Sequence, residues 1–302
     1  MPMGRSDPRL HQTIILLDGR TLGFAEYGDL SGRPVLFFPG TPSGRLFHHP
    51  DESIARSVGA RVFAIDRPGY GLSDFQPGRT LLDWPDDVVQ LADALGIHRF
   101  SVVGISGGGP HAAACAFKIP QRLTAACIVS VMGPLDRPGA TAGLPSVRRL
   151  SATVAKHAPW LVRPLLWLVS NPHRDSGRFL EQITAQSAKA DRAILARPEV
   201  RAMLIENWAE ATRRGLRGYA QEAVLLCRPW GFRLGDLTMH VQLWQGSADA
   251  VTPLSMGRWV EEAISDCRAT FLPDEGHFLL FDHWTEILAA MVSWRWQEGS
   301  RN

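Results

Sequence analysis

The chain has 302 residues, 45% of them hydrophobic and 21% charged, and its formal net charge is +2 from 32 basic and 30 acidic side chains. This near-balance of charge gives no support to a nucleic-acid partner, and the length suits one large α/β domain with a sizeable core. No run approaches the roughly 18 apolar residues of a membrane helix, which argues against stable membrane insertion. Four scattered cysteines (Cys115, Cys127, Cys227 and Cys267) form no metal-binding or disulfide pattern, and no secretory signal is recognised, so we expect a cytoplasmic protein.

Short apolar strands alternate with helical patterns along the first part of the chain. Residues 13–17 and 22–27 flank the turn Asp18-Gly19 and predict a hairpin. Buried strands are predicted at 35–38, 61–65, 100–105 and 125–131, and helices at 49–58, 83–95 and 111–118. This alternation is typical of βαβ units and predicts a doubly wound, mostly parallel sheet.

The pattern changes after residue 133 and is helical through residue 236. Strand patterns return at 239–244 and 269–272, and a closing helix is predicted at 284–296. We therefore predict three segments. Residues 1–133 form the first part of an α/β core, 134–236 form an inserted helical cap, and 237–302 form the second part of the core.

The segment 134–236 is also the basic part of the chain. It holds 16 Lys and Arg against 9 Asp and Glu, a net charge of +7, which leaves −5 for the remainder. Two interpretations stay open: helices with solvated arginine faces, or a basic surface near a site for anionic or membrane-proximal substrates. The segment carries Trp160, Trp167, Trp208 and Trp230. We expect most of these to anchor the packing of short helices, and one or two to line a substrate pocket.

The strongest local signal is the G-x-S-x-G sequence Gly104-Ile105-Ser106-Gly107-Gly108, between a predicted strand and a predicted helix. An abrupt turn from strand to helix strains the central residue, and glycines two positions to either side avoid collisions. The serine hydroxyl then projects from the carboxyl edge of the sheet, near the N–H groups of the following helix. This context favours Ser106 as a nucleophile over a glycine-rich turn that binds phosphate or only packs tightly.

A serine nucleophile needs a general base, and the chain offers ten histidines. His277 follows the last predicted strand, in a loop at the carboxyl edge where Ser106 is expected. Asp249 follows the strand at 239–244 and is the expected carboxylate partner of the histidine, with an ordinary turn aspartate as the competing interpretation. Asp136, after the preceding strand, is the alternative acid.

The chain order Ser106, Asp249, His277 is that of the α/β-hydrolases. With Pro39-Gly40-Thr41-Pro42 and the stretch from Asp66 to Asp74 (DRPGYGLSD), it makes the sequence resemble the α/β-hydrolase superfamily almost from end to end. The resemblance implies an α/β-hydrolase fold: a doubly wound, mostly parallel eight-stranded sheet with an inserted helical cap. It also implies that residues 66–74 form a structural loop near the site and supply no catalytic group.

The first of these motifs departs from the family pattern, which usually reads His-Gly-x-Pro, because Pro39 occupies the histidine position. The resemblance implies an oxyanion hole formed by the backbone N–H groups of Thr41 and Ile105. Both residues are non-proline and so carry the donor. Loss of the histidine therefore need not abolish the hole, although it bears on the geometry of the loop.

These residues predict a serine hydrolase that cleaves a carboxylic ester or related acyl bond of a small, apolar substrate. It would use Ser106, His277 and Asp249 and an acyl-enzyme, with no metal or organic cofactor. Serine at position 106 argues against the dehalogenase and epoxide-hydrolase relatives, which use aspartate there. Carbon–carbon bond hydrolases, cofactor-free haloperoxidases and proline iminopeptidases of the same fold stay open, as does a non-catalytic small-molecule-binding protein on this scaffold. The sequence does not indicate an oligomeric state.

Overall fold

An eight-stranded sheet forms the centre of the computed structural model, which describes residues 7–137, 139–141, 143–144 and 146–293. The strands are β1 (Gln12–Ile15), β2 (Thr21–Gly28), β3 (Arg33–Phe38), β4 (Ala60–Ile65), β5 (Phe100–Ile105), β6 (Leu123–Val129), β7 (Val241–Gly246) and β8 (Cys267–Leu272). Their order is β1-β2-β4-β3-β5-β6-β7-β8. Pairing is antiparallel from β1 through β2 to β4 and parallel from β4 to β8. The predicted doubly wound, mostly parallel sheet is confirmed.

Alternate side chains of the central strands face two separate helical layers, because successive residues of a strand point to opposite faces. In β3, Leu36 and Phe38 pack in one hydrophobic cluster, whereas Val35 and Phe37 pack in the other. The first face is covered by α2 (Trp84–Ala94), α3 (Gly109–Lys118) and α10 (Leu254–Ala263), and the second by α1 (Ser53–Ser57) and α11 (Leu280–Ser293). Burial on both faces explains why these strands are almost wholly apolar.

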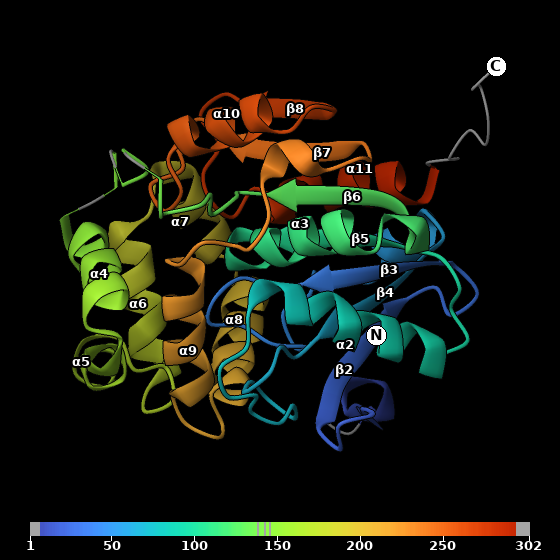
Figure 1. Ribbon diagram of the computed structural model, residues 1–302, viewed down its shortest axis with the longest axis horizontal. Helices are drawn as coiled ribbons and strands as arrows, with labels where there is room; N and C mark the ends of the chain where they lie inside the picture. The colour runs from blue at the N-terminus through green and yellow to red at the C-terminus, as the bar shows by residue number, and fades with distance from the viewer. Residues whose placement is uncertain (1–6, 138, 142, 145, 294–302) are drawn as a thin grey trace.

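The segment between β6 and β7 contains a group of helices that we call the helical insertion. Its described members are α4 (Ser146–His157), the 3-10 turn η5 (Pro159–Leu161), α5 (Val162–Val169), α6 (Ser176–Gln186), α7 (Lys189–Leu195), α8 (Pro198–Ala211) and α9 (Arg217–Leu226). They gather at the end of the sheet toward which the arrows of β3 and β6 point (Figure 1). Side chains at the carboxyl edge of the parallel strands are therefore expected to lie between the sheet and the insertion. None of the described helices combines the length and apolarity needed to cross a membrane.

The four tryptophans of the insertion segment divide into two pairs. Trp208 and Trp230 are buried, and Trp208 packs edge-on against Phe179. Trp160 and Trp167 are instead 71% and 58% exposed. The expectation that most of the four anchor packing is therefore wrong for Trp160 and Trp167.

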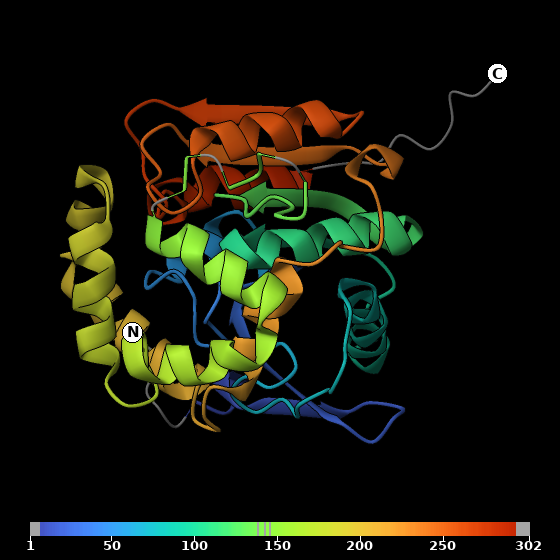
Figure 2. The same cartoon turned by 60° about the vertical axis from the view of Figure 1, so that its left-hand side comes forward.

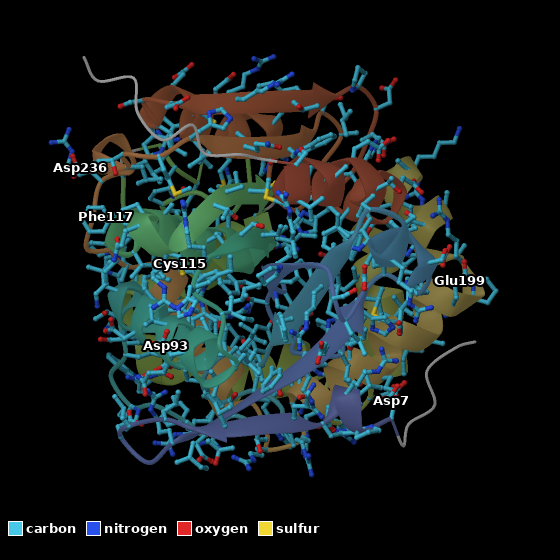
Figure 3. The ribbon with its side chains drawn as sticks, turned by 90° about the vertical axis from the view of Figure 1, so that its right-hand side faces the viewer. Asp7, Asp93, Cys115, Phe117, Glu199 and Asp236 are labelled. Carbon is cyan, nitrogen blue, oxygen red and sulfur yellow. The ribbon has the colours of Figure 1, made fainter. Side chains whose placement is uncertain are left out.

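Two predicted helices have different limits in the structure. The helix expected at 49–58 begins only at Ser53, because Pro50 disfavours helical conformation in the preceding residue and the Asp51 carboxylate accepts a hydrogen bond from Ser53 N at 2.9 Å. The closing helix starts at Leu280, and its predicted end at residue 296 lies outside the described residues. All four cysteines are free of disulfides, and Cys115 lies on α3 in the interior (Figure 3).

Candidate active site

Ser106 occupies the turn from β5 into α3. Its φ of 54° places a non-glycine residue in the left-handed region, a strained conformation that clusters at functional sites. A Cβ atom at Gly104 would collide with the backbone of Gly108, and one at Gly108 would collide with the carbonyl of Phe38. The turn therefore needs both glycines, for the steric reason that the sequence motif suggests.

His277 and Asp249 form a buried pair. The two atoms His277 Nδ1 and Asp249 Oδ2 lie 2.8 Å apart. Asp249 follows β7 and His277 follows β8, and these strands are parallel neighbours, so both side chains come from the same edge of the sheet. A carboxylate at Nδ1 favours the tautomer with its proton there, which leaves Nε2 able to accept a proton from another group.

The Asp249 carboxylate is held by a nearly complete set of donors. Its Oδ1 accepts hydrogen bonds from the backbone N–H of Val251 at 2.7 Å and of Thr252 at 2.8 Å. Its Oδ2 lies 2.7 Å from Thr252 Oγ1 and 3.1 Å from Gln245 Nε2. Burial opposes ionisation of this carboxyl, but the His277 imidazole and the Thr252 hydrogen bonds outweigh it and lower the pKa of Asp249. Asp249 is therefore a fixed, ionised partner for the imidazole.

A segment after β6 connects the histidine loop to the serine turn. Ser130 Oγ donates to the His277 carbonyl oxygen at 2.9 Å, and Met132 N donates to the Ser106 carbonyl oxygen at 3.3 Å. The loop after β8 thus folds back across β7 to reach β6, the direct neighbour of β5. The described side chains of Ser106 and His277 lie at this common edge and make no hydrogen bond to each other. Hydrogen bonds of this kind often form fully only when substrate is bound.

Asp136, the alternative acid, has an exposed side chain and no hydrogen bond to His277, although both residues are described. The imidazole contacts Asp249 instead. The structure therefore brings together the first-choice acid and base.

Residues 39–41, which we call the oxyanion loop after its predicted role, lie against the serine turn. A Cβ atom at Gly40 would stand 3.4 Å from Ser106 Cβ, and one at Gly107 would collide with the Thr41 hydroxyl. Thr41 is thus adjacent to Gly107, the residue that follows the serine. The assignment of Ile105 to the oxyanion hole is wrong, because Ile105 is the last residue of β5 and precedes Ser106, whereas the family rule takes the residue after the nucleophile.

Sequence reasoning missed a buried network of charges that holds the oxyanion loop. Arg67 Nη1 donates to the Pro39 carbonyl oxygen, and Arg67 Nη2 donates to the Gly40 carbonyl oxygen at 3.0 Å. The same guanidinium binds Glu222 of α9, with Nε–Oε2 at 2.8 Å and Nη2–Oε1 at 2.6 Å. The Thr41 hydroxyl donates to Glu222 Oε1. One glutamate of the helical insertion is therefore bonded to this loop both directly and through Arg67.

A second arm of this network reaches the serine turn. Arg79 Nη2 donates to Glu222 Oε2 at 2.8 Å, and Arg79 Nη1 lies 3.3 Å from His111 Nε2. His111 Nδ1 lies 2.9 Å from the Gly107 carbonyl oxygen. Burial, reinforced by the nearby guanidinium of Arg67, lowers the pKa of His111 to about 3, so the ring is neutral, accepts from Arg79 and donates to Gly107. Burial opposes ionisation of Glu222, but the two arginines outweigh it and lower its pKa to about 2.

The helical insertion also contacts the histidine loop through Asp191 of α7. The two carboxylate oxygens accept from His277 N at 3.0 Å and from Phe278 N at 2.8 Å. A Cβ atom at Gly276 would collide with this carboxylate. Burial raises the pKa of Asp191, and the two backbone N–H groups only partly oppose that effect. No motif in the sequence marks Asp191 or Glu222, because each bonds to residues far away along the chain.

Among the described residues, no group of three or more His, Cys, Asp or Glu side chains is arranged to hold a metal ion. The independence from metals and cofactors stays a prediction. What the site offers is a hydroxyl, an imidazole oriented by a carboxylate, and a loop of backbone N–H groups, the set that acyl transfer requires.

Comparisons with known proteins agree on the scaffold. The sequence profile of the alpha/beta hydrolase fold family matches residues 33–283. The putative non-heme bromoperoxidase BpoC of Mycobacterium tuberculosis is 24% identical over 269 residues, covering 87% of this chain and 93% of that protein. A non-heme chloroperoxidase of Streptomyces lividans is 33% identical over 126 residues, 41% of this chain and 45% of that protein. A thermophilic esterase from Thermogutta terrifontis matches the fold with a TM-score of 0.66 at 23% identity, covering 94% of this chain and 97% of that structure.

Proposed function

The chain belongs to the alpha/beta hydrolase fold family, and on that premise we propose that it is a serine hydrolase acting on carboxylic esters or related acyl bonds of a small, apolar substrate. The observation that carries the proposal is the 2.8 Å contact between His277 Nδ1 and Asp249 Oδ2, at the sheet edge that also holds Ser106 in a strained turn. Stability of the fold does not require a buried imidazole–carboxylate pair beside a strained serine. Acyl transfer by a serine requires both.

In the proposed reaction, His277 Nε2 removes the hydroxyl proton of Ser106 as Oγ attacks the carbonyl carbon of the substrate. The carbonyl π electrons move to oxygen, and the tetrahedral oxyanion forms. The intermediate then collapses, the carbon–oxygen bond to the alcohol breaks, and His277 gives its proton to the leaving alcohol. Water repeats the cycle on the acyl-enzyme and releases the acid, while Asp249 stays ionised and hydrogen-bonded to His277.

The oxyanion is assigned to the backbone N–H groups of Thr41 and Gly107. Gly107 replaces Ile105 in this role because it follows the nucleophile and lies against Thr41. Each such donor is typically worth about 10²–10³ in turnover. Glu222 and Asp191 act as positioning residues in this scheme: Glu222 fixes the oxyanion loop through Thr41 and Arg67, and Asp191 fixes the backbone of His277.

Turnover of p-nitrophenyl esters of increasing acyl length tests the proposal. We expect hydrolysis with a burst of p-nitrophenol, a preference among the acyl chains, and loss of both in Ser106→Ala. A vinylogous diketone run beside the esters tests carbon–carbon bond cleavage. A folded protein that binds these esters and turns over neither class would favour the non-catalytic alternative.

A second candidate activity is cofactor-free halide oxidation, and the bromoperoxidase and chloroperoxidase relatives are the observation that favours it. In this reaction the carboxylic acid first acylates Ser106 with loss of water. Hydrogen peroxide then attacks the acyl carbon, the bond to Ser106 Oγ breaks as the oxygen regains its proton from His277, and the peracid leaves. The peracid oxidises bromide to hypobromite and is itself reduced to the carboxylic acid. The assay follows bromination of monochlorodimedone with acetate, bromide and peroxide. Acetate-dependent bromination that exceeds ester hydrolysis, and disappears in Ser106→Ala, would make this the principal activity.

A further inference from the structure

The outer side of the helical insertion exposes an unusual amount of apolar surface. The large hydrophobic side chains exposed there are Leu150, Trp160, Leu161, Trp167, Leu168 and Val169, with exposures from 48% to 74%. All of them belong to α4, η5 and α5, which pack against one another. Figure 2 shows α4 and α5, in light green, along the side of the insertion that has been turned forward. We call the exposed side chains of α4, η5 and α5 the outer face.

Helix α5 explains how so much apolar surface is left uncovered. Its sequence, VRPLLWLV, is apolar nearly all round. One side is used inside the protein, where Val162 and Leu166 pack in a small cluster with residues of α4 and α9. The opposite side, with Trp167 and Leu168, has no covering element among the described residues. A helix that is apolar on every side normally contacts apolar material on every side.

The charges of the outer face have one sign only. The sequence has no Asp or Glu between Asp136 and Asp175. Exposed cations on the outer face are Arg149, Lys156 and Arg163. None of these three pairs with a described carboxylate. Elsewhere arginines commonly do, as Arg20 does with Asp87 at 2.6 Å and Arg201 with Glu181 at 2.5 Å.

We propose that the outer face docks on the surface of an anionic lipid membrane. Exposed tryptophan and leucine beside unpaired Lys and Arg is the composition of elements that lie in the membrane interface, where the apolar side chains enter the acyl boundary and the cations meet lipid phosphates. A second copy of the chain is a poorer occupant. A two-fold contact would place this cationic face against itself, with no acid in the face to compensate. The absence of a membrane-spanning helix among the described residues fits docking on the surface.

The test is co-sedimentation of the full chain with vesicles of phosphatidylcholine alone and of phosphatidylcholine mixed with phosphatidylglycerol. Wild type should bind the anionic vesicles, with a blue shift of tryptophan emission, and release as salt is raised. The double variants Trp167→Ser/Leu168→Ser and Lys156→Glu/Arg163→Glu should each lower vesicle affinity at least about 10-fold. The matched control is Ile15→Ser/Leu17→Ser, which removes even more exposed apolar side chains from another surface and should bind as wild type does.

Three results would overturn the proposal. They are no binding to the anionic vesicles, equal binding to both vesicle types, and unchanged binding by the outer-face variants. A lipid-free dimer in light scattering that dissociates in Trp167→Ser/Leu168→Ser would also overturn it, by assigning the face to a second copy. Because binding is measured without a substrate, the result does not depend on the proposed esterase activity. Unchanged thermal unfolding of the variants excludes misfolding as the cause of lost binding.

Discussion

The helical insertion has an outward half and an inward half that use charge in opposite ways. In the outward half, α4 to α5, cations are exposed, unpaired with described carboxylates, and mixed with bare tryptophan and leucine. In the inward half, Asp191 of α7 and Glu222 of α9 are fully buried, and each bonds to a loop of the proposed catalytic site. The exposed Glu199 at the start of α8 lies at the margin of the molecule (Figure 3). The comparison teaches that the net charge of +7 over this segment does not describe a uniform surface.

The two buried carboxylates of the inward half have different hydrogen-bond partners. Glu222 is neutralised by two guanidinium groups, Arg67 and Arg79, and its pKa is lowered to about 2. Asp191 faces two backbone N–H groups and no arginine, and burial raises its pKa. A buried charge is costly unless it is paired. The two carboxylates hold comparable loops but should respond differently to pH.

The largest loss of kcat is expected when Asp249, the acid of the proposed site, is changed. The losses expected in the inward and outward halves are smaller and are compared with this one. Asp249→Asn removes the charge that orients His277, and we expect kcat for a p-nitrophenyl ester to fall about 10³–10⁴-fold. Asp136→Asn is the matched control and should leave kcat near the wild-type value. If Asp136→Asn produced the large loss and Asp249→Asn did not, the assignment of the acid would be overturned.

A smaller loss of kcat is expected when the hydrogen bond or the charge that joins Glu222 of the inward half to the oxyanion loop is removed. Thr41→Val removes only the hydroxyl that donates to Glu222, and Glu222→Gln removes the charge. Each should lower kcat about 10- to 100-fold through misplacement of the loop, with little change in KM. Glu210→Gln is the matched control, because Glu210 is also an insertion carboxylate bonded to a core arginine, Arg45 at 2.7 Å, yet touches no catalytic loop.

A double-mutant cycle decides whether Glu222 acts through Thr41. If it does, Glu222→Gln should lower kcat much less in the Thr41→Val background than in wild type. Fully additive losses in kcat, together with equal losses of unfolding stability, would reduce Glu222 to a structural residue. Thr41→Val keeps the pairs of Glu222 with Arg67 and Arg79, so the loss of kcat in this variant alone tests the contact if Glu222→Gln does not fold.

The free energy of unfolding should depend on pH with opposite sign for the two buried carboxylates. The pKa of Glu222 lies below its ordinary 4.5, so its stabilising contribution, on the order of 3 kcal/mol, is present above pH 4.5 and is lost as pH falls toward 2. The pKa of Asp191 lies above its ordinary 3.8, so the cost of ionising it is present above the raised value and disappears as pH falls from that value toward 3.8. The charged and titratable groups that act on Asp191 are His277 and Asp249, and those that act on Glu222 are Arg67, Arg79 and His111.

Urea unfolding between pH 3 and 7 measures this difference. Relative to Glu222→Gln, wild type should lose stability on acidification, and relative to Asp191→Asn it should gain stability. If the stability difference from wild type changed with pH in the same direction for both variants, Glu222 and Asp191 would not differ in the way their pKa shifts predict.

The smallest effect is expected in the outward half. Trp167→Ser/Leu168→Ser should change kcat for a soluble short-chain ester by less than about twofold, because neither side chain belongs to a cluster that reaches the site. A large loss with this substrate, in a variant of unchanged thermal stability, would place these side chains in the catalytic pocket and remove the distinction between the halves.

The sequence predicted the sheet and the proposed catalytic side chains because both depend on short-range patterns. Ser106 has a motif, and Asp249 and His277 each follow a strand whose apolar run is readable. The prediction of Ile105 as an oxyanion donor is wrong because Ile105 precedes Ser106 in the chain, whereas the expected donor follows the nucleophile. Glu222 lies 155 residues from Arg67, and Asp191 lies 86 residues from His277, so no local pattern could pair them. The exposure of Trp160 and Trp167 depends on which sides of α4 and α5 are covered, which only tertiary packing decides.

The central claim is that Ser106 is a nucleophile activated by His277, and reaction with a fluorophosphonate tests it most directly. Intact mass and peptide mapping should find one adduct per chain, on Ser106. The adduct should be absent in Ser106→Ala, and its rate should fall steeply in His277→Ala. A wild-type protein that is folded and hydrolyses esters but carries the adduct on another residue, or labels equally fast without His277, would contradict the account.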